Sequence, residues 1–159
     1  MSDRAAALLS ALVARGWTVT TAESCTGGMV AAAITDIAGS SQVFEQGFVT
    51  YSNTAKIALL DVAPETLDAV GAVSEEVVRE MAEGARRRAG AALAVAISGI
   101  AGPGGSEHKP EGRVCFALAS EHAEIFSETV EFGVLGRAEV RCAAREHALD
   151  LLLKAAKSG

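Results

Sequence analysis

Apolar side chains recur at helical spacing at both ends of the chain. Leu8, Leu9, Leu12 and Val13 form one stripe, and Gly16 follows where a C-cap is expected, so we predict a helix over about 3–15. A stripe near the end predicts a last helix over about 136–156. Between them, the pattern and the capping residues predict further helices at about 27–37, at 54–60 after an Asn53 cap, at 64–70, and from a Ser74 cap to about 88.

Short β-branched, aromatic or wholly apolar runs separate these helices. We predict strands at 17–21, 44–51 and 92–98, followed by a hairpin of two strands at 113–119 and 124–132. Helices and strands therefore alternate for most of the length. This alternation predicts one α/β domain over 1–159, a three-layer α/β/α domain with a mixed, mostly parallel sheet.

The composition narrows the class of protein. Half of the 159 residues are hydrophobic and the net charge is −6, which excludes a disordered chain. An acidic balance argues against nucleic acid and against an anionic membrane as partners. We find no run long enough to span a membrane and no secretory leader, so we expect a cytoplasmic protein. The three cysteines and three histidines are dispersed, so we expect no metal and no cofactor.

The first segment with chemical potential follows the strand at 17–21. Ser24 and Cys25 come just before Thr26, Gly27 and Gly28, which open a helix. Free backbone N–H groups at a helix start can hold an oxyanion, so Ser24 is a candidate nucleophile in acyl transfer. Cys25 is a rival, because a helix start lowers the pKa of a thiol. The alternative is that Ser24 or Thr26 only caps the helix.

A second segment follows the strand at 44–51. Lys56 falls in the first turn of the helix that Asn53 is expected to cap. The helix dipole disfavours a cation there, which lowers the pKa of the lysine and makes it a candidate general base. Tyr51 could relay a proton or bind substrate. The alternative is that Lys56 points into water and Tyr51 belongs to the core.

A third segment is rich in glycine and follows the buried strand at 92–98. Ser98 ends this strand, and Gly102, Gly104 and Gly105 follow within seven residues. Such a loop allows close backbone approach to a ligand, although a purely structural turn fits the composition equally well. Later in the chain, Arg137 and Arg141 lie one helical turn apart; they could reach a phosphate or simply belong to a solvated helix face.

Together these segments resemble the CinA C-terminal domain family of nicotinamide-nucleotide amidases, in its standalone form. The resemblance rests on TAESCTGG at 21–28, GSS at 39–41, YSNTAKIALLDV at 51–62, GAVSEEV at 71–77 and SGIAGPGG at 98–105. Several motifs in the family's order cover nearly the whole chain. The chain departs from the pattern at Ser98, where threonine is expected, in a short 106–110 loop, and in lacking an acidic residue before Arg137.

The resemblance implies an α/β fold and an activity. That activity is hydrolysis of the carboxamide of nicotinamide mononucleotide to nicotinic acid mononucleotide and ammonia, in pyridine-nucleotide recycling. Ser24 would be the nucleophile, Lys56 its base and Tyr51 an assisting group, while the glycines at 102–105 would help to form the nucleotide pocket. A homo-oligomer is also implied. The alternative is a non-catalytic nucleotide-binding module, or a regulatory protein linked to competence and DNA damage.

Overall fold

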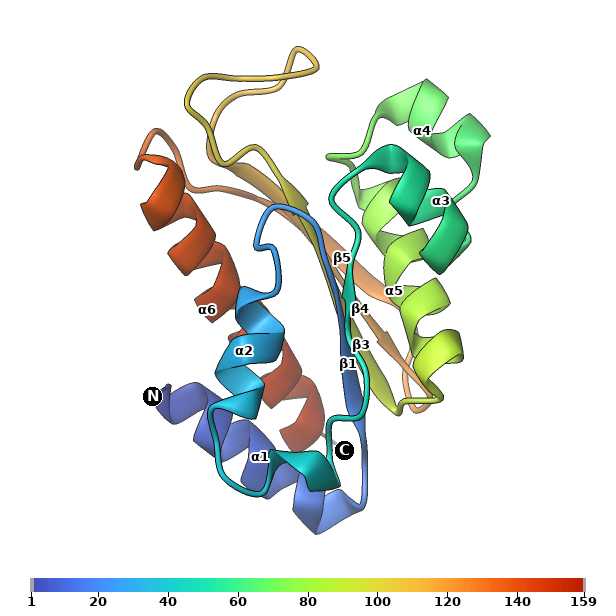
Figure 1. Ribbon diagram of the computed structural model, residues 1–159, viewed down its shortest axis with the longest axis vertical. Helices are drawn as coiled ribbons and strands as arrows, with labels where there is room; N and C mark the ends of the chain where they lie inside the picture. Colours follow the sequence, from blue (N-terminus) through green and yellow to red (C-terminus); the bar gives the residue numbers. More distant parts are fainter. Residues whose placement is uncertain (1, 159) are drawn as a thin grey trace.

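A five-stranded mixed sheet forms the centre of the molecule, and helices cover both of its faces (Figure 1). The computed structural model describes residues 2–158, so the outermost residues of the predicted domain, 1 and 159, lie outside the described part. The elements are α1 (Asp3–Arg15), β1 (Val19–Glu23), α2 (Met29–Thr35), η1 (Ser40–Gln42), β2 (Phe48–Val49), α3 (Asn53–Leu60), α4 (Pro64–Val70), α5 (Glu75–Ala89), β3 (Leu93–Gly99), β4 (Arg113–Ser120), β5 (Phe126–Glu131) and α6 (Arg137–Lys157).

The strand order is β2-β1-β3-β4-β5. β1 pairs in parallel with β2 and with β3, whereas β3–β4 and β4–β5 are antiparallel. The prediction of a mostly parallel sheet is therefore corrected to an even mixture. The physical reason is that no helix crosses between β3, β4 and β5, and a parallel neighbour requires such a crossover.

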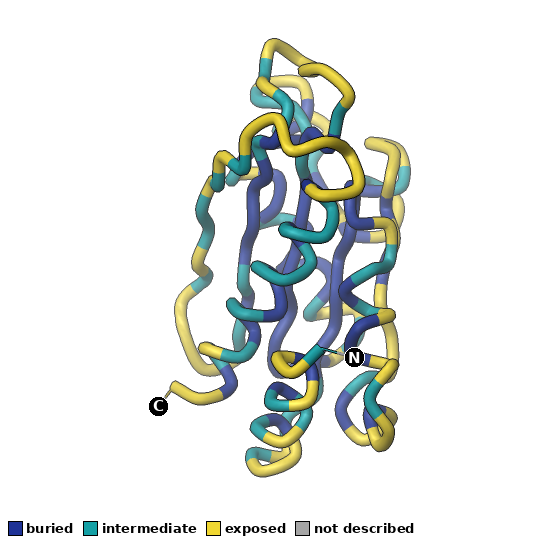
Figure 2. The backbone as a smooth tube through the Cα atoms, turned by 90° about the vertical axis from the view of Figure 1, so that its left-hand side faces the viewer, coloured by how far each residue is buried: buried dark blue, intermediate teal, exposed yellow. Residues whose placement is uncertain are grey.

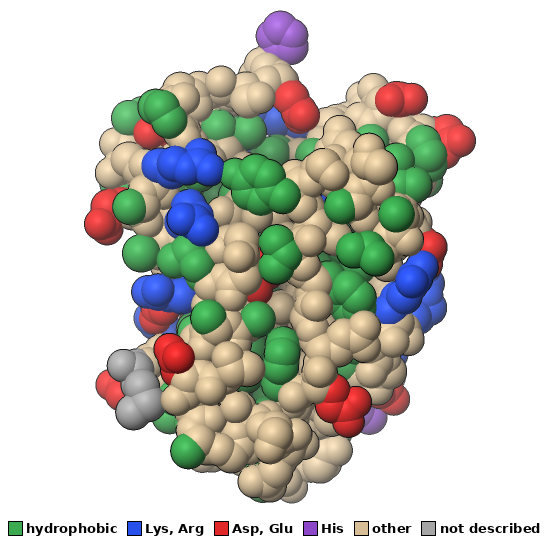
Figure 3. All heavy atoms as spheres, viewed as in Figure 1, with side chains coloured by type: hydrophobic (Ala, Val, Ile, Leu, Met, Phe, Trp, Pro, Cys, Tyr) green, Lys and Arg blue, Asp and Glu red, His purple; other side chains and the backbone are tan. Residues whose placement is uncertain are grey.

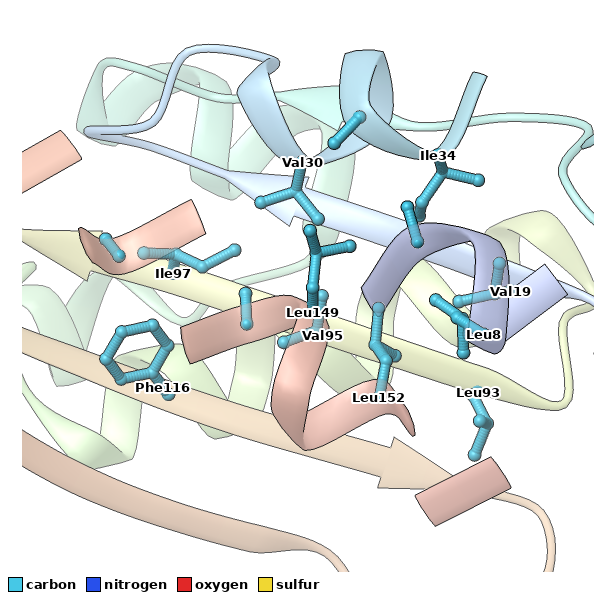
Figure 4. Close-up of a cluster of buried hydrophobic side chains, with 14 of the residues drawn as sticks. Leu8, Val19, Val30, Ile34, Leu93, Val95, Ile97, Phe116, Leu149 and Leu152 are labelled. Carbon is cyan, nitrogen blue, oxygen red and sulfur yellow. The ribbon is translucent and has the colours of Figure 1, made fainter. Parts of the chain in front are cut away.

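Two apolar cores lie on the two faces of the sheet. One packs α1, α2 and α6 against the sheet, and Figure 4 shows its members Leu8, Val30, Val95 and Leu149 meeting between helices and strands. The other packs α4 and α5, with the end of α3, against the opposite face. β1, β3 and most of β4 are buried between these layers, as the dark central strands in Figure 2 show, whereas the edge strand β5 is partly exposed.

Local sequence signals account for the helix ends. Ser74 caps α5 by accepting from Val77 N–H, and Gly90 ends it in the left-handed conformation. α3 differs from the prediction by one residue, because Ser52 rather than Asn53 caps it. β2 is far shorter than the predicted 44–51 strand, with only an isolated bridge from Val19 to Phe44 before it. The 27–37 helix is likewise reduced to α2.

Candidate active site

Three neighbouring strands end at one edge of the sheet, and their following loops meet there. β1, β2 and β3 are parallel, so their carboxyl ends coincide. The connection after β1 carries α2 on one face of the sheet, and the connection after β2 carries α3 to α5 on the other. Such a divergence of connections is where ligands bind in open α/β sheets. A pocket of about 340 Å³ lies at this point.

Residues from all three loops line the pocket. The lining comprises Ser24, Cys25, Tyr51, Asn53, Lys56, Ala72, Val73, Ser98, Gly99, Ile100, Ala101, Gly102, Pro103, Gly104, Gly105, Ser106, Glu107 and Arg137. The structure thus brings together eight of the eleven site residues predicted from the sequence. The other three, Thr26, Gly27 and Gly28, lie outside this lining.

Lys56 and Ser24 are in direct contact at the floor of the pocket. The Nζ of Lys56 lies 3.0 Å from the Oγ of Ser24 and 2.8 Å from the carbonyl oxygen of Thr50, with a longer contact of 3.5 Å to the carbonyl of Tyr51. The side chain of Lys56 is only 1% exposed, so the alternative that it points into water is wrong. Burial lowers its pKa from 10.5 to about 8. The predicted direction is confirmed, but its main cause is desolvation.

Cys25 shares the pocket but has a different electrostatic character. Its side chain is buried, and this burial raises the pKa of the thiol to about 11. The expectation that a helix start would activate this thiol is therefore wrong. The reason is that loss of hydration outweighs the neighbouring N–H groups and the charge of Arg141, which act in the opposite direction. The thiol is protonated at neutral pH.

Tyr51 and Arg137 form the rim of the pocket. Tyr51 is largely exposed, and its hydroxyl accepts a hydrogen bond of 2.7 Å from the Nη2 of Arg137. The Nη1 of Arg137 donates to the carbonyl oxygen of Gly102 at 2.6 Å. These two contacts join the loop after β2, the glycine loop after β3 and the start of α6. The alternative that Tyr51 is a core residue is wrong.

The glycine loop needs its glycines for steric reasons. Gly102 has a φ of +92°, and a Cβ there would lie 2.7 Å from the Oε1 of Glu111. A Cβ on Gly105 would lie 2.4 Å from the carbonyl oxygen of Lys109. The carboxylate of Glu111 in turn accepts from the N–H of Gly104 at 2.6 Å. The loop is therefore folded tightly by its own residues along one wall of the pocket.

Not every N–H group after Ser24 is free to meet a ligand. Gly27 N–H donates to the carbonyl of Ser24, and Gly28 N–H donates to the carboxylate of Glu23. Within residues 2–158, the N–H groups of Cys25 and Thr26 donate to no carbonyl or carboxylate oxygen. Thr26 is fully buried and lies outside the pocket lining, so the oxyanion site expected over residues 25–28 narrows to the N–H of Cys25.

The comparisons with known proteins show the family to which the chain belongs. The family model described as the CinA C-terminal domain matches residues 1–156. The chain belongs to this family. A nicotinamide-nucleotide amidohydrolase PncC from Enterobacter agglomerans is 53% identical over 146 residues, which are 91% of this chain and 88% of the relative. A protein of the same name from Escherichia coli strain K12 is 66% identical over 115 residues, 72% of this chain and 70% of the relative.

Solved structures of the CinA family share the fold. The competence/damage inducible protein CihA from Agrobacterium tumefaciens superposes with a TM-score of 0.93 at 44% identity, covering 98% of this chain and 94% of that one. No helix within residues 2–158 is both long and apolar enough to cross a membrane. On the face of the described residues that Figure 3 shows, Lys and Arg side chains gather at the left and at the right, while Asp and Glu side chains lie mostly around the margin.

The sequence reasoning missed Glu23 and the contacts of Arg141. Glu23 is fully buried and its carboxylate accepts from the N–H groups of Gly28, Val30 and Ala31. Arg141 is half-buried, lies outside the pocket lining and donates to carbonyls of the loop after β1. A glutamate directly before a candidate nucleophile was the one available signal. Arg141 gave none, because its partners are more than a hundred residues away.

Proposed function

We propose that the protein is a nicotinamide-nucleotide amidohydrolase, which converts nicotinamide mononucleotide and water to nicotinic acid mononucleotide and ammonia. The observation that carries the proposal is the 3.0 Å contact between the buried amine of Lys56 and the hydroxyl of Ser24 in the pocket. Relatives named nicotinamide-nucleotide amidohydrolase, at 53% and 66% identity, support this choice of substrate.

The surroundings of Lys56 suit its neutral form. The carbonyl oxygens of Thr50 and Tyr51 can only accept hydrogen bonds, so they take the two hydrogens of a neutral amine. The lone pair of the amine then faces the Oγ of Ser24 and can accept the hydroxyl proton. With a pKa of about 8, roughly one tenth of the amine is neutral at pH 7 and about nine tenths at pH 9. Lys56 therefore acts as the general base.

The proposed reaction proceeds through an ester on Ser24. The Oγ attacks the carboxamide carbon as its proton moves to Lys56 Nζ, and the carbonyl π electrons move to oxygen. The N–H of Cys25 stabilises this oxyanion; one such donor is typically worth about 10²–10³ in rate. The C–N bond then breaks, and the nitrogen leaves as ammonia with the proton from Lys56. Water attacks the ester by the same route, which releases the carboxylate and restores Ser24.

The rim residues bind the remainder of the nucleotide. Arg137 is exposed and lines the pocket, so its guanidinium pairs with the phosphate of the substrate. Tyr51 accepts a hydrogen bond from Arg137 and keeps its own hydroxyl hydrogen for the substrate or the departing ammonia. Ser98 and the glycine loop form the wall beside the ring. Since the nucleophile and the base are both side chains, the scheme requires neither a metal nor a cofactor.

The decisive experiment is ammonia release from nicotinamide mononucleotide by the purified protein. We expect turnover in the wild type, loss of at least about 10³-fold in Ser24→Ala and in Lys56→Ala, and a change below about threefold in Cys25→Ala. The reverse result for Ser24→Ala and Cys25→Ala would overturn the assignment of the nucleophile. Binding of the nucleotide without any ammonia would instead favour a non-catalytic sensor.

A further inference from the structure

The loop that carries Ser24 is held by charged side chains on two sides. On the β1 side, the buried carboxylate of Glu23 accepts N–H bonds from the start of α2. On the α6 side, the guanidinium of Arg141 donates from Nε to the carbonyl of Cys25 at 2.9 Å and from Nη2 to the carbonyl of Thr26 at 3.3 Å. The carboxylate of Glu23 thus accepts hydrogen bonds from N–H groups that follow the loop, and the guanidinium of Arg141 donates hydrogen bonds to two of its carbonyls.

Gly27 makes room for the cation. A Cβ at this position would lie 3.2 Å from the Nη2 of Arg141, and the φ of +59° also favours glycine. The TGG sequence after Cys25 is therefore explained in part by the approach of Arg141, since Gly27 itself does not line the pocket. This contact links residues 116 positions apart in the chain.

The position of Arg141 bears on the oxyanion site. The C=O and N–H of a trans peptide point in opposite directions, so fixing the carbonyl of Cys25 also fixes the N–H of Thr26. The carbonyl of Ser24 is held by Gly27 N–H in the same turn, which fixes the N–H of Cys25. Of the two residues, Cys25 lines the pocket and Thr26 does not, so Arg141 bears on the site by holding the carbonyl of Cys25 and with it the position of this residue. Arg141 itself does not line the pocket.

We propose that Arg141 is a positioning residue for acyl transfer. It acts through the loop: by holding the carbonyls of Cys25 and Thr26 it keeps Ser24 and the N–H of Cys25 in place for the forming oxyanion, and its positive charge behind the loop favours the negative oxygen. This inference rests on the proposed function. Because positioning matters most in the transition state, loss of Arg141 lowers kcat rather than substrate binding.

The test compares Arg141→Met and Arg141→Lys with Arg145→Met as the matched control. Arg145 lies one turn further along α6, is similarly half-buried and contacts Glu146 instead of the loop. We expect kcat of ammonia release to fall about 10- to 100-fold in Arg141→Met with KM changed by less than about threefold. Arg141→Lys recovers part of the loss, and Arg145→Met resembles the wild type. A lower melting temperature with unchanged kcat would overturn the proposal.

A second measurement does not depend on amidase activity. The rate at which a fluorophosphonate labels Ser24 reports the same oxyanion donor, because its phosphoryl oxygen takes the place of the oxyanion, and Ser24→Ala gives the background. We expect labelling to be about tenfold slower in Arg141→Met than in the wild type and in Arg145→Met. Slower labelling combined with no ammonia release by the wild type would refute the amidase and retain the role of Arg141. If the wild type, Arg141→Met and Arg145→Met are labelled at the same rate, or if none of them is labelled, the proposed role of Arg141 is overturned.

Discussion

The two ends of the sheet each carry a hollow, and the larger one is not the candidate site. The pocket at the carboxyl ends of β1, β2 and β3 measures about 340 Å³, whereas the hollow at the opposite end, beside Trp17, His122 and Phe126, measures about 640 Å³. Only the smaller one contains a buried lysine against a hydroxyl. The charged residues of the larger hollow are all partly or fully exposed. In this protein, the volume of a hollow therefore indicates the candidate active site less well than a buried lysine does.

The two ends also differ in strand direction. At the candidate site, parallel strands end side by side, and the turn after β1 leaves peptide N–H groups without partners in the described chain. At the other end, the polypeptide returns through short connections that use their backbone groups. Ala92 and Leu93 donate to the carbonyl of Thr18, Glu121 donates to that of Ala92, and His122 donates to the hydroxyl of Ser120. The N–H groups of Ala123 and Glu124 have no partner within residues 2–158, so the two ends differ in the buried lysine rather than in the number of free donors.

Of the substitutions that test this contrast, we expect Lys56→Met to have the largest effect on the rate of ammonia release. Turnover falls by at least about 10³-fold, because the general base is lost. In the wild type, kcat/KM rises about tenfold from pH 7 to pH 9 as Lys56, with a pKa of about 8, loses its proton. Steady-state ammonia release across this pH range checks both statements. A flat profile in the wild type would contradict the role of Lys56.

The same substitution has the opposite effect on stability. The pKa of Lys56 is about 8 in the folded protein against an ordinary 10.5, so between these values the unfolded chain binds more protons. The cost of burying the charge is full below pH 8 and disappears as pH rises towards 10.5. Lys56→Met therefore raises the free energy of unfolding at pH 7 by about 1–3 kcal/mol, and the gain shrinks by pH 10. Urea unfolding of Lys56→Met measures this, with the exposed Lys154→Met as control.

A smaller, selective effect is expected at the rim of the same pocket. Arg137→Met raises KM for nicotinamide mononucleotide about tenfold, because one phosphate contact is worth roughly 1.5–3 kcal/mol, and leaves kcat nearly unchanged. Nicotinamide riboside lacks the phosphate, so its kinetics do not respond. Steady-state kinetics with both substrates checks this. If Arg137→Met changed the kinetics of both substrates equally, Arg137 would act only through Tyr51. The variant Tyr51→Phe removes the contact between these two residues and tests it separately.

Local patterns were enough for most elements and for the floor of the site. Strong caps and periodic apolar faces predicted α1, α5 and α6 closely. The three loops after strands were recognised because nucleophile, base and glycines each follow a strand end. β2 was overestimated, since its sequence suits a strand but only two residues pair with β1. The expected homo-oligomer stays a prediction.

Properties set by depth or by distant partners could not be read from the sequence. Lys56 is buried with its amine against the carbonyl of Thr50, just after β2, and the hydroxyl of Ser24, just after β1, which no helical pattern indicates. The same burial that lowers the pKa of this amine raises that of the Cys25 thiol, whereas the helix-start argument applied one local rule to both. Arg141 reaches the loop of Ser24 from the other end of the chain.

The smallest effect on activity is expected at the larger hollow. Trp17 stacks on His122 with ring centroids 4.5 Å apart, and the guanidinium of Arg15 lies 4.5 Å from the Trp17 ring. Trp17→Ala removes both contacts and should lower the free energy of unfolding by about 1–2 kcal/mol. Turnover stays within about twofold, since no backbone donor of the active site depends on this end. Chemical denaturation and ammonia release on the same sample separate the two quantities. If turnover fell by more than the fraction of folded protein, the two ends of the sheet would be coupled through β1. The contact between Ser24 and Lys56 would then not be enough to explain why activity depends on one end only.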